Sequence, residues 1–88
     1  AVTVHPNPAN PGTTISWRLA ASGRVRVVVH DLGGRRVRVL VDGIRPAGRD
    51  DAHWDGRDDA GARVAAGAYV ARVEAAPDIA TVKVVLLP

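Results

Sequence analysis

Acidic side chains crowd into one short stretch of this sequence, residues 50–59. The stretch holds five aspartates, and Asp55, Asp58 and Asp59 fall within five consecutive positions. Carboxylate oxygens are ligands that Ca²⁺ prefers, and the ion takes about six to eight oxygens. Paired carboxylates also act as general acid and base where a pocket drives their pKa values apart. The residue types therefore raise two kinds of chemistry, calcium binding and acid–base catalysis.

The spacing of these aspartates favours a structural turn over either kind of site. It lacks the D-x-D-x-D-G order and the distal Glu of an EF-hand loop. Nearby arginines give no reason for two carboxyl pKa values to separate, so we predict no catalytic residue. Asp followed by Gly is typical of a turn, because Asp accepts backbone N–H groups and Gly tolerates positive φ. If the loop does bind calcium, the candidate ligands are Asp55, Asp58 and Asp59.

The same stretch contains the residues that we expect to shape the turn and tie it to the core. The two aromatic side chains are predicted to face inward at its ends, and the Asp and Gly residues between them to form the bends. These predicted structural residues are Trp54, Asp55, Gly56, Gly61, Gly67 and Tyr69.

The other chemistry-bearing residues form no recognisable site. His5, His30 and His53 lack the spacing of zinc ligands, and the chain has no Cys. Neither serine has a nearby His–acid arrangement for nucleophilic catalysis. The glycine pair in DLGGRR lacks the G-K-[ST] ending of a phosphate-binding loop. We expect no cofactor, no metal and no enzymatic activity.

Positive charge is concentrated in the middle of the chain. Of the twelve basic residues eleven are arginine, seven of these lie in residues 24–49, and the net charge is +3. Arginine-rich segments can bind phosphate backbones, but the three aromatic residues do not interleave with them as base stacking would need. We expect solvated strand faces, on which charge discourages edge pairing, and no nucleic-acid partner. No apolar run approaches the roughly 20 residues of a membrane span.

The elements that must position these side chains are β-strands, because the hydrophobic pattern has a period of two. Ile15, Trp17 and Leu19 alternate with polar residues, and the same alternation recurs along the chain. The Val37, Val39 and Val41 series is expected on one face of its strand. The predicted strands are 2–5, 13–20, 24–31, 36–41, 49–55, 68–75 and 81–87, with loops at 42–48 and 76–80.

About seven short strands with turns at regular spacing predict an all-β fold. We expect residues 1–88 to form a single domain, an antiparallel immunoglobulin-like β-sandwich. Trp17, Trp54 and Tyr69 are predicted core residues rather than an exposed carbohydrate platform, since a domain without Phe has few other bulky side chains. The chain starts with Ala and contains no Met, so we expect it to be a fragment of a longer protein or a processed product.

Four segments in order carry a family resemblance: NPANPGTTISWRL, VVVHDLGGRRVRVLVDG, AGRDDAHWDGRDDAGARVAAGAYVARVEA and TVKVVLLP. They resemble the immunoglobulin-like domain of flagellar hook-capping proteins and the related C-terminal sorting domains of type IX secretion cargo. The long W-D-G-x-D-x-x-G-x-x-V-x-x-G-x-Y block is the most specific part. Ala9, His30 and Ala66 depart from the family's usual Phe, Tyr and Ser.

The resemblance implies a non-enzymatic module of a secreted or cell-surface bacterial protein, used for sorting, anchoring or assembly. Its partners would be proteins, either secretion or surface-assembly machinery or further copies of itself. The candidate contact surfaces are the first and last strands and the arginine faces of residues 24–30 and 35–41. Two alternatives remain: a β-sandwich that binds carbohydrate or calcium, and a self-assembling extracellular subunit that donates an edge strand.

Overall fold

The computed structural model describes residues 2–88, which form seven β-strands and no helix. No helix within that part of the chain is long and apolar enough to cross a membrane. The strands are β1 (Thr3–His5), β2 (Thr13–Leu19), β3 (Gly23–Asp31), β4 (Arg36–Arg45), β5 (Gly48–Trp54), β6 (Gly67–Ala75) and β7 (Asp78–Leu86).

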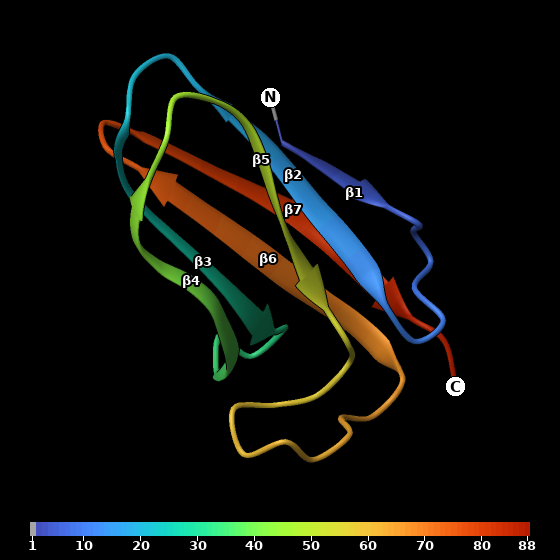
Figure 1. The fold of residues 1–88 in the computed structure, drawn as a ribbon. Coiled ribbons are helices and arrows are strands. Elements are labelled where there is room, and N and C mark those ends of the chain that lie inside the picture. The colour runs from blue at the N-terminus through green and yellow to red at the C-terminus, as the bar shows by residue number, and fades with distance from the viewer. Residues whose placement is uncertain (1) are drawn as a thin grey trace.

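The strands make two sheets that pack face to face. One sheet has the order β1-β2-β5 and the other β4-β3-β6-β7, and every strand pairing is antiparallel. Figure 1 shows the three-stranded sheet lying across the four-stranded one, with the β5–β6 loop beyond one end of the sandwich. The predicted all-β immunoglobulin-like sandwich of about seven antiparallel strands is confirmed.

The core lies between the sheets and is built from the inward residues of the period-two pattern. Ile15 and Trp17 of β2 face the valines of β3 and the Tyr69, Ala71 and Val73 series of β6. A small domain gains most of its stability from this apolar area removed from water. The buried core residues are Ala9, Ile15, Trp17, Val25, Val27, Val29, Val41, Trp54, Tyr69, Ala71, Val73, Val84 and Leu86.

The N-terminal segment joins both sheets. Its first part, β1, pairs with β2, and it then crosses to the edge of β7, where Ala9 and Leu86 form a parallel bridge. The backbone N–H of Ala9 donates to the carbonyl of Val85 at 2.7 Å, and the N–H of Leu87 donates to the carbonyl of Ala9 at 2.9 Å. Asn7 adds two side-chain bonds, to the carbonyl of Lys83 and from the N–H of Val85. This segment therefore covers one half of the β7 edge.

The predicted alternation in β4 is wrong. Its register against β3 shifts between Val27 and Val28 and again between Val29 and His30, so β4 is bulged. Each extra residue in a bulge reverses which side chains face the core. Val37 and Leu40 accordingly pack against the core, whereas Val39 lies opposite Val28 on the outer side. A valine at every second position indicates a strand but not where its partner forces a bulge.

Three further sequence expectations need correction. The loop predicted at 42–48 is mostly strand, since β4 continues to Arg45 and β5 begins at Gly48. The turn predicted at 76–80 is shorter, because β7 begins at Asp78. Val28, expected on the exposed arginine face, is buried. The first two errors share a cause: Pro and Gly mark a chain reversal, but long strands continue up to it as long as a neighbour supplies hydrogen bonds.

The packing difference between two isoleucines gives a test of this core. Ile15 is fully buried, whereas Ile44 is 75% exposed. Truncating a buried Ile leaves a cavity and removes apolar contacts, so Ile15→Ala is expected to lower the free energy of unfolding by about 2–4 kcal/mol. Ile44→Ala is the matched control and should change it by no more than about 0.5 kcal/mol. Urea denaturation followed by Trp fluorescence measures both, and equal losses would contradict the described core.

Candidate functional site

The acidic loop, residues 55–66 between β5 and β6, is held at both ends by two aromatic core residues, Trp54 and Tyr69. Trp54, the last residue of β5, is fully buried, and its ring meets Tyr69 edge-on with centroids 5.3 Å apart. The Nε1–H of Trp54 donates to the carbonyl of Arg57 at 2.9 Å, and the Tyr69 hydroxyl donates to the carbonyl of Ala65. Both ends of the loop are therefore held by side chains that the core already immobilises. Desolvation, with the nearby Asp31 charge adding to it, raises the pKa of the Tyr69 hydroxyl.

The loop folds back on itself as a narrow hairpin. Arg57 and Arg63 form an isolated antiparallel bridge, and the N–H of Asp58 donates to the carbonyl of Ala62 at 2.9 Å. Gly56 has φ of +79°, and a Cβ there would lie 3.3 Å from the carbonyl oxygen of Pro11. A side chain at this position would be strained by both its backbone angle and the close approach. The loop is thus shaped by hydrogen bonds and glycine geometry.

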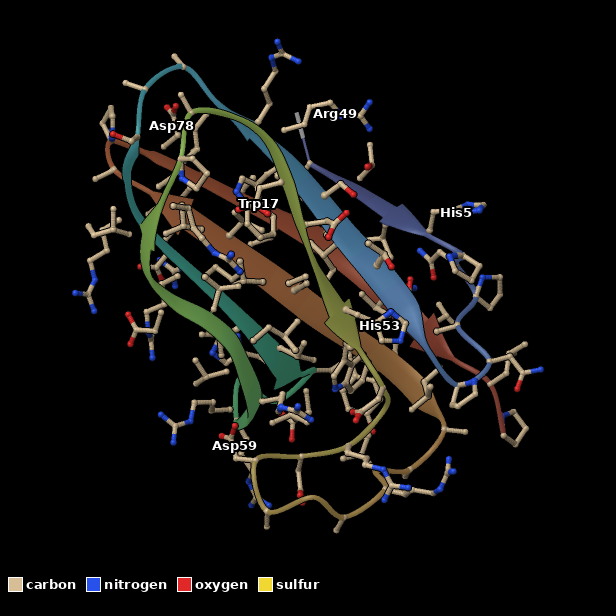
Figure 2. All side chains as sticks on the ribbon, in the orientation of Figure 1. His5, Trp17, Arg49, His53, Asp59 and Asp78 are labelled. Carbon is tan, nitrogen blue, oxygen red and sulfur yellow. The ribbon has the colours of Figure 1, made fainter. Side chains whose placement is uncertain are left out.

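Asp58 and Asp59 each satisfy backbone donors. One carboxylate oxygen of Asp58 accepts the N–H groups of Ala60 and Ala62 at 3.0 and 2.9 Å. Asp59 binds β4 of the four-stranded sheet. Its Oδ1 accepts the Val39 N–H at 2.9 Å, and its own N–H donates to the Val37 carbonyl at 2.9 Å. Figure 2 shows Asp59 at the end of the sandwich next to β4. These contacts dock the loop on the edge of β4.

Asp55 is held by a guanidinium and a backbone donor. Its Oδ1 accepts the Arg57 N–H and the Nη1–H of Arg38, both at 3.1 Å. Arg38 also donates to the carbonyl of Arg57. Desolvation opposes ionisation of Asp55, but the Arg57 hydrogen bond and the Arg38 charge outweigh it and lower the pKa of the Asp55 carboxyl. The bulge in β4 is what turns Arg38 toward this end of the core.

The three candidate calcium ligands are each directed at different protein partners. Asp55 binds Arg38, Asp58 binds the tip of its own hairpin, and Asp59 binds β4 and the Nε of Arg36 at 3.3 Å. Within residues 2–88 no group of three or more His, Asp or Glu side chains is placed to hold one metal ion. The carboxylates thus act as hydrogen-bond acceptors that fold the loop.

The histidines are divided between the sheets. His5 and His53 flank Thr14 in one row of the three-stranded sheet, and His30 belongs to the other sheet. The ring of His53 lies against Gly12, with its Nδ1 3.3 Å from the Thr14 hydroxyl oxygen. In Figure 2, His5 lies at the outer edge of β1 while His53 lies on β5.

The arginine faces are largely neutralised by acids on the same surface. Asp42 pairs with both Arg24 and Arg26, and Asp50 lies 3.6 Å from the Nε of Arg45. The pairs of Arg36, Arg38 and Arg72 with Asp59, Asp55 and Glu74 continue this pattern. Exposed pairs of this kind stabilise a fold by only about 0–1 kcal/mol each. They offset part of the positive charge of these faces.

Sequence reasoning missed two residues that organise these surfaces. Arg38 looked like an outward member of an alternating strand, and only the bulge reveals its link to the acidic loop. Asn7 looked like part of a proline-rich connection, yet its side-chain amide donates to the Lys83 carbonyl and accepts the Val85 N–H at one edge of β7. An Asn between two prolines was the available signal, since its side chain supplies the donor that Pro lacks.

The lowered pKa of Asp55 predicts a pH effect on stability. Its folded pKa lies below the ordinary value of 3.8, so its contribution is present above pH 3.8 and disappears as the pH falls through the folded pKa. Asp55→Asn keeps the acceptor oxygen but removes the charge. We expect the variant to melt below the wild type at pH 7, with the gap closing as the pH falls below 3.8 and through the folded pKa. Thermal melts from pH 7 to 2 measure this, and a gap independent of pH would contradict it.

The engaged carboxylates also predict indifference to calcium. A ligand that binds only the folded state raises the melting temperature with its concentration. Because Asp55, Asp58 and Asp59 face different partners, 5 mM CaCl₂ should shift the melting temperature by less than about 1 °C relative to EDTA. Scanning calorimetry on the wild type, with Asp58→Asn as a matched variant, measures this. A larger shift lost in the variant would instead establish a calcium site.

Known structures share this fold over most of the chain. PorZ, an essential bacterial surface component of the type-IX secretion system of Porphyromonas gingivalis, aligns with all of it at 24% identity and a TM-score of 0.68. Dimeric latent PorU from the same organism aligns with 98% at 19% identity and 0.71. FlgD from P. aeruginosa aligns with 82% at 25% identity and 0.59. The chain spans 12%, 9% and 57% of those proteins' chains.

Comparison of the sequence with protein families gives the same assignment as the structural likenesses. No curated protein matches the chain. A family model, that of the FlgD Ig-like domain, matches residues 5–78. This range includes both core tryptophans, the acidic loop and the whole of β2 to β6. Since the match covers well over half of the sequence, the chain belongs to the FlgD Ig-like domain family.

Proposed function

We propose that this chain is a non-enzymatic, protein-recognising module that sorts or anchors a secreted or cell-surface bacterial protein. The observation that carries the proposal is the family match over residues 5–78, together with the shared fold of a type-IX secretion surface component. The proposal treats residues 1–88 as one domain and its partners as proteins of the secretion or assembly machinery. It needs no cofactor, metal or nucleic acid.

The structure supports a recognition role through what its polar groups do. The aspartates of the acidic loop bind backbone N–H groups and arginines, so they hold the loop in shape. Trp54 and Tyr69 are buried against each other, so they offer no aromatic platform to a sugar. We therefore place recognition on the strand edges and loop ends, where a sandwich presents backbone groups to other proteins.

Assembly is the second role that an observation favours. The matching family model takes its name from FlgD, and the FlgD structure resembles 82% of this chain at 25% identity. In that role the domain would be a scaffold unit of an extracellular structure. Donation of the N-terminal segment to another copy would have to break the pairing of Ala9 with β7, in which Ala9 is fully buried.

A reporter fusion tests the sorting role. The domain is fused to the C-terminal end of a soluble reporter in P. gingivalis, an organism with a type-IX secretion system. We expect the reporter to become accessible to added protease on intact cells only when the domain is present. Lys83→Glu, at the lysine that resembles the one in sorting domains, should reduce export several-fold without changing the melting temperature, because it is an exposed position.

The matched control is Arg49→Glu, a charge reversal at an exposed position on β5 in the other sheet, which should export normally. Circular dichroism on the purified fusions confirms that each domain is folded. Retention of a folded wild-type fusion inside the cell would overturn the sorting role and favour assembly as the function of the domain. Equal export with and without the domain would have the same consequence.

A further inference from the structure

Among residues 2–88, one half of the β7 edge has backbone groups without a hydrogen-bond partner. β7 pairs with β6 in an unbroken register from Asp78 to Leu86, and β6 is its only strand neighbour within residues 2–88. The carbonyl of Lys83 and both backbone groups of Val85 bind Asn7 and Ala9 on the side away from β6. Because backbone direction alternates along a strand, Ile79 and Thr81 also direct their N–H and C=O groups away from β6.

A groove of about 630 Å³ adjoins this free half-edge, and Arg18, Arg24 and Asp78 line it together with apolar residues. It opens at the end of the sandwich between the β6–β7 turn and the end of β2, and its apolar walls are formed by Val2, Trp17, Leu19, Val73, Ala75 and Ile79. Figure 2 shows Trp17 between the two sheets and Asp78 near this end. Trp17 is 4% exposed, and its Nε1–H has no hydrogen-bond partner among residues 2–88. A buried donor without an acceptor is costly, so the groove wall already holds a polar group that lacks a partner.

The other half of the same edge shows what kind of group fits here. Ala9 forms a one-residue parallel bridge with Leu86, with backbone bonds to Val85 and Leu87, and bends lie on either side of it. The Ala9 side chain enters the core and is fully buried. A single residue, Ala9, thus docks on β7 by its backbone and fills the space between the sheets with its side chain. The free half, Asp78–Val82, offers the same backbone pattern beside a larger apolar space.

This free half also lacks the devices that usually protect an edge strand. Such edges are blunted by Lys, Pro, bulges or covering loops. Here residues 78–82 read Asp-Ile-Ala-Thr-Val, with one charge at the very start, and Ile79 is 59% exposed. The edge of β4, in contrast, is bulged and is covered by Asp59. The β7 half-edge is therefore the unprotected one of the two edges of its sheet.

We propose that the β7 half-edge, Asp78–Val82, is a docking site for an extended peptide segment of a partner protein. The segment adds a strand beside β7, and its alternate apolar side chains enter the groove next to Trp17. This mode of recognition takes affinity from main-chain hydrogen bonds and specificity from pockets for alternate side chains. The inference rests on the proposed function only in taking the domain's partner to be a protein.

A second copy of the domain fits the edge less well than a single peptide. Antiparallel pairing of two β7 strands about Ala80 would set position 83 of one copy opposite position 77 of the other. The turn of the second copy would then meet Asn7, which already occupies the edge at Lys83 and Val85. A lone extended segment of about five residues ends before that obstacle, since each residue advances about 3.4 Å.

Peptide titration of the ¹⁵N-labelled domain tests the site. The probe is acetyl-Thr-Val-Thr-Val-Thr-amide, and the control peptide has Ser in place of each Val. We expect the Thr81 amide and the Trp17 indole resonances to shift on addition of the Val peptide, and exchange of the Thr81 amide hydrogen to slow. The Trp54 indole, already bonded to Arg57, is the internal reference and should stay in place.

Two variants separate edge binding from other contacts. Thr81→Pro removes an outward N–H without breaking the β6 ladder and should weaken binding about tenfold. Thr81→Val keeps the N–H and should bind like the wild type. Val2→Asp places a charge on the groove wall and should also weaken binding, which keeps the test valid if the Pro variant unfolds.

Three outcomes would overturn the inference: no shift at 1 mM peptide, equal binding of the Ser peptide, or shifts that map to a different edge. Dimerisation of the wild type through β7, seen by sedimentation and abolished by Thr81→Pro, would assign the edge to a second copy and would also overturn it. None of these readouts depends on export. The peptide-docking inference can therefore be wrong while the sorting role is right, and the sorting role can be wrong while the docking inference is right.

Discussion

The contact between Trp54 and Tyr69 is the interaction on which the rest of this structure depends. These two rings meet where β5 ends and β6 begins, and they close one end of the core. In a domain with three aromatic residues and no Phe, few other side chains could fill that volume. Because Trp54 also holds the Arg57 carbonyl and Tyr69 holds the Ala65 carbonyl, the whole acidic loop takes its position from the core.

The acidic loop in turn is bonded to β4 of the four-stranded sheet. Asp59 pairs with the backbone of β4, and Asp55 pairs with Arg38, which the β4 bulge turns toward the loop. Carboxylates that stabilise a fold by accepting backbone donors and arginines have little freedom to bind a metal or transfer a proton. The most diagnostic stretch of the sequence is therefore a signature of architecture. It supports the family assignment.

The edges of the four-stranded sheet are protected to different degrees. A sandwich of this size must protect its outer strands, and it does so by different means: a bulge and a docked loop on β4, and the Asn7–Ala9 segment on half of β7. The N-terminal segment can cover this half of the β7 edge because the side chain of Asn7 supplies a donor that the flanking prolines lack. Where that cover ends, the sheet offers unpaired groups next to an apolar groove, a combination suited to strand addition.

The sequence by itself determined the number and order of the strands, the inward series of β2, β6 and β7, and the turn chemistry of the acidic stretch, because these follow from local period, propensity and φ requirements. It did not determine the bulges of β4, the inward turn of Arg38 or the reach of Asn7 to β7. Those depend on which residues of distant strands lie opposite, as with Val28 and Val39 or Asn7 and Val85. Only tertiary pairing decides register, and register decides which charges are neutralised, which edge is covered and where a groove is left open.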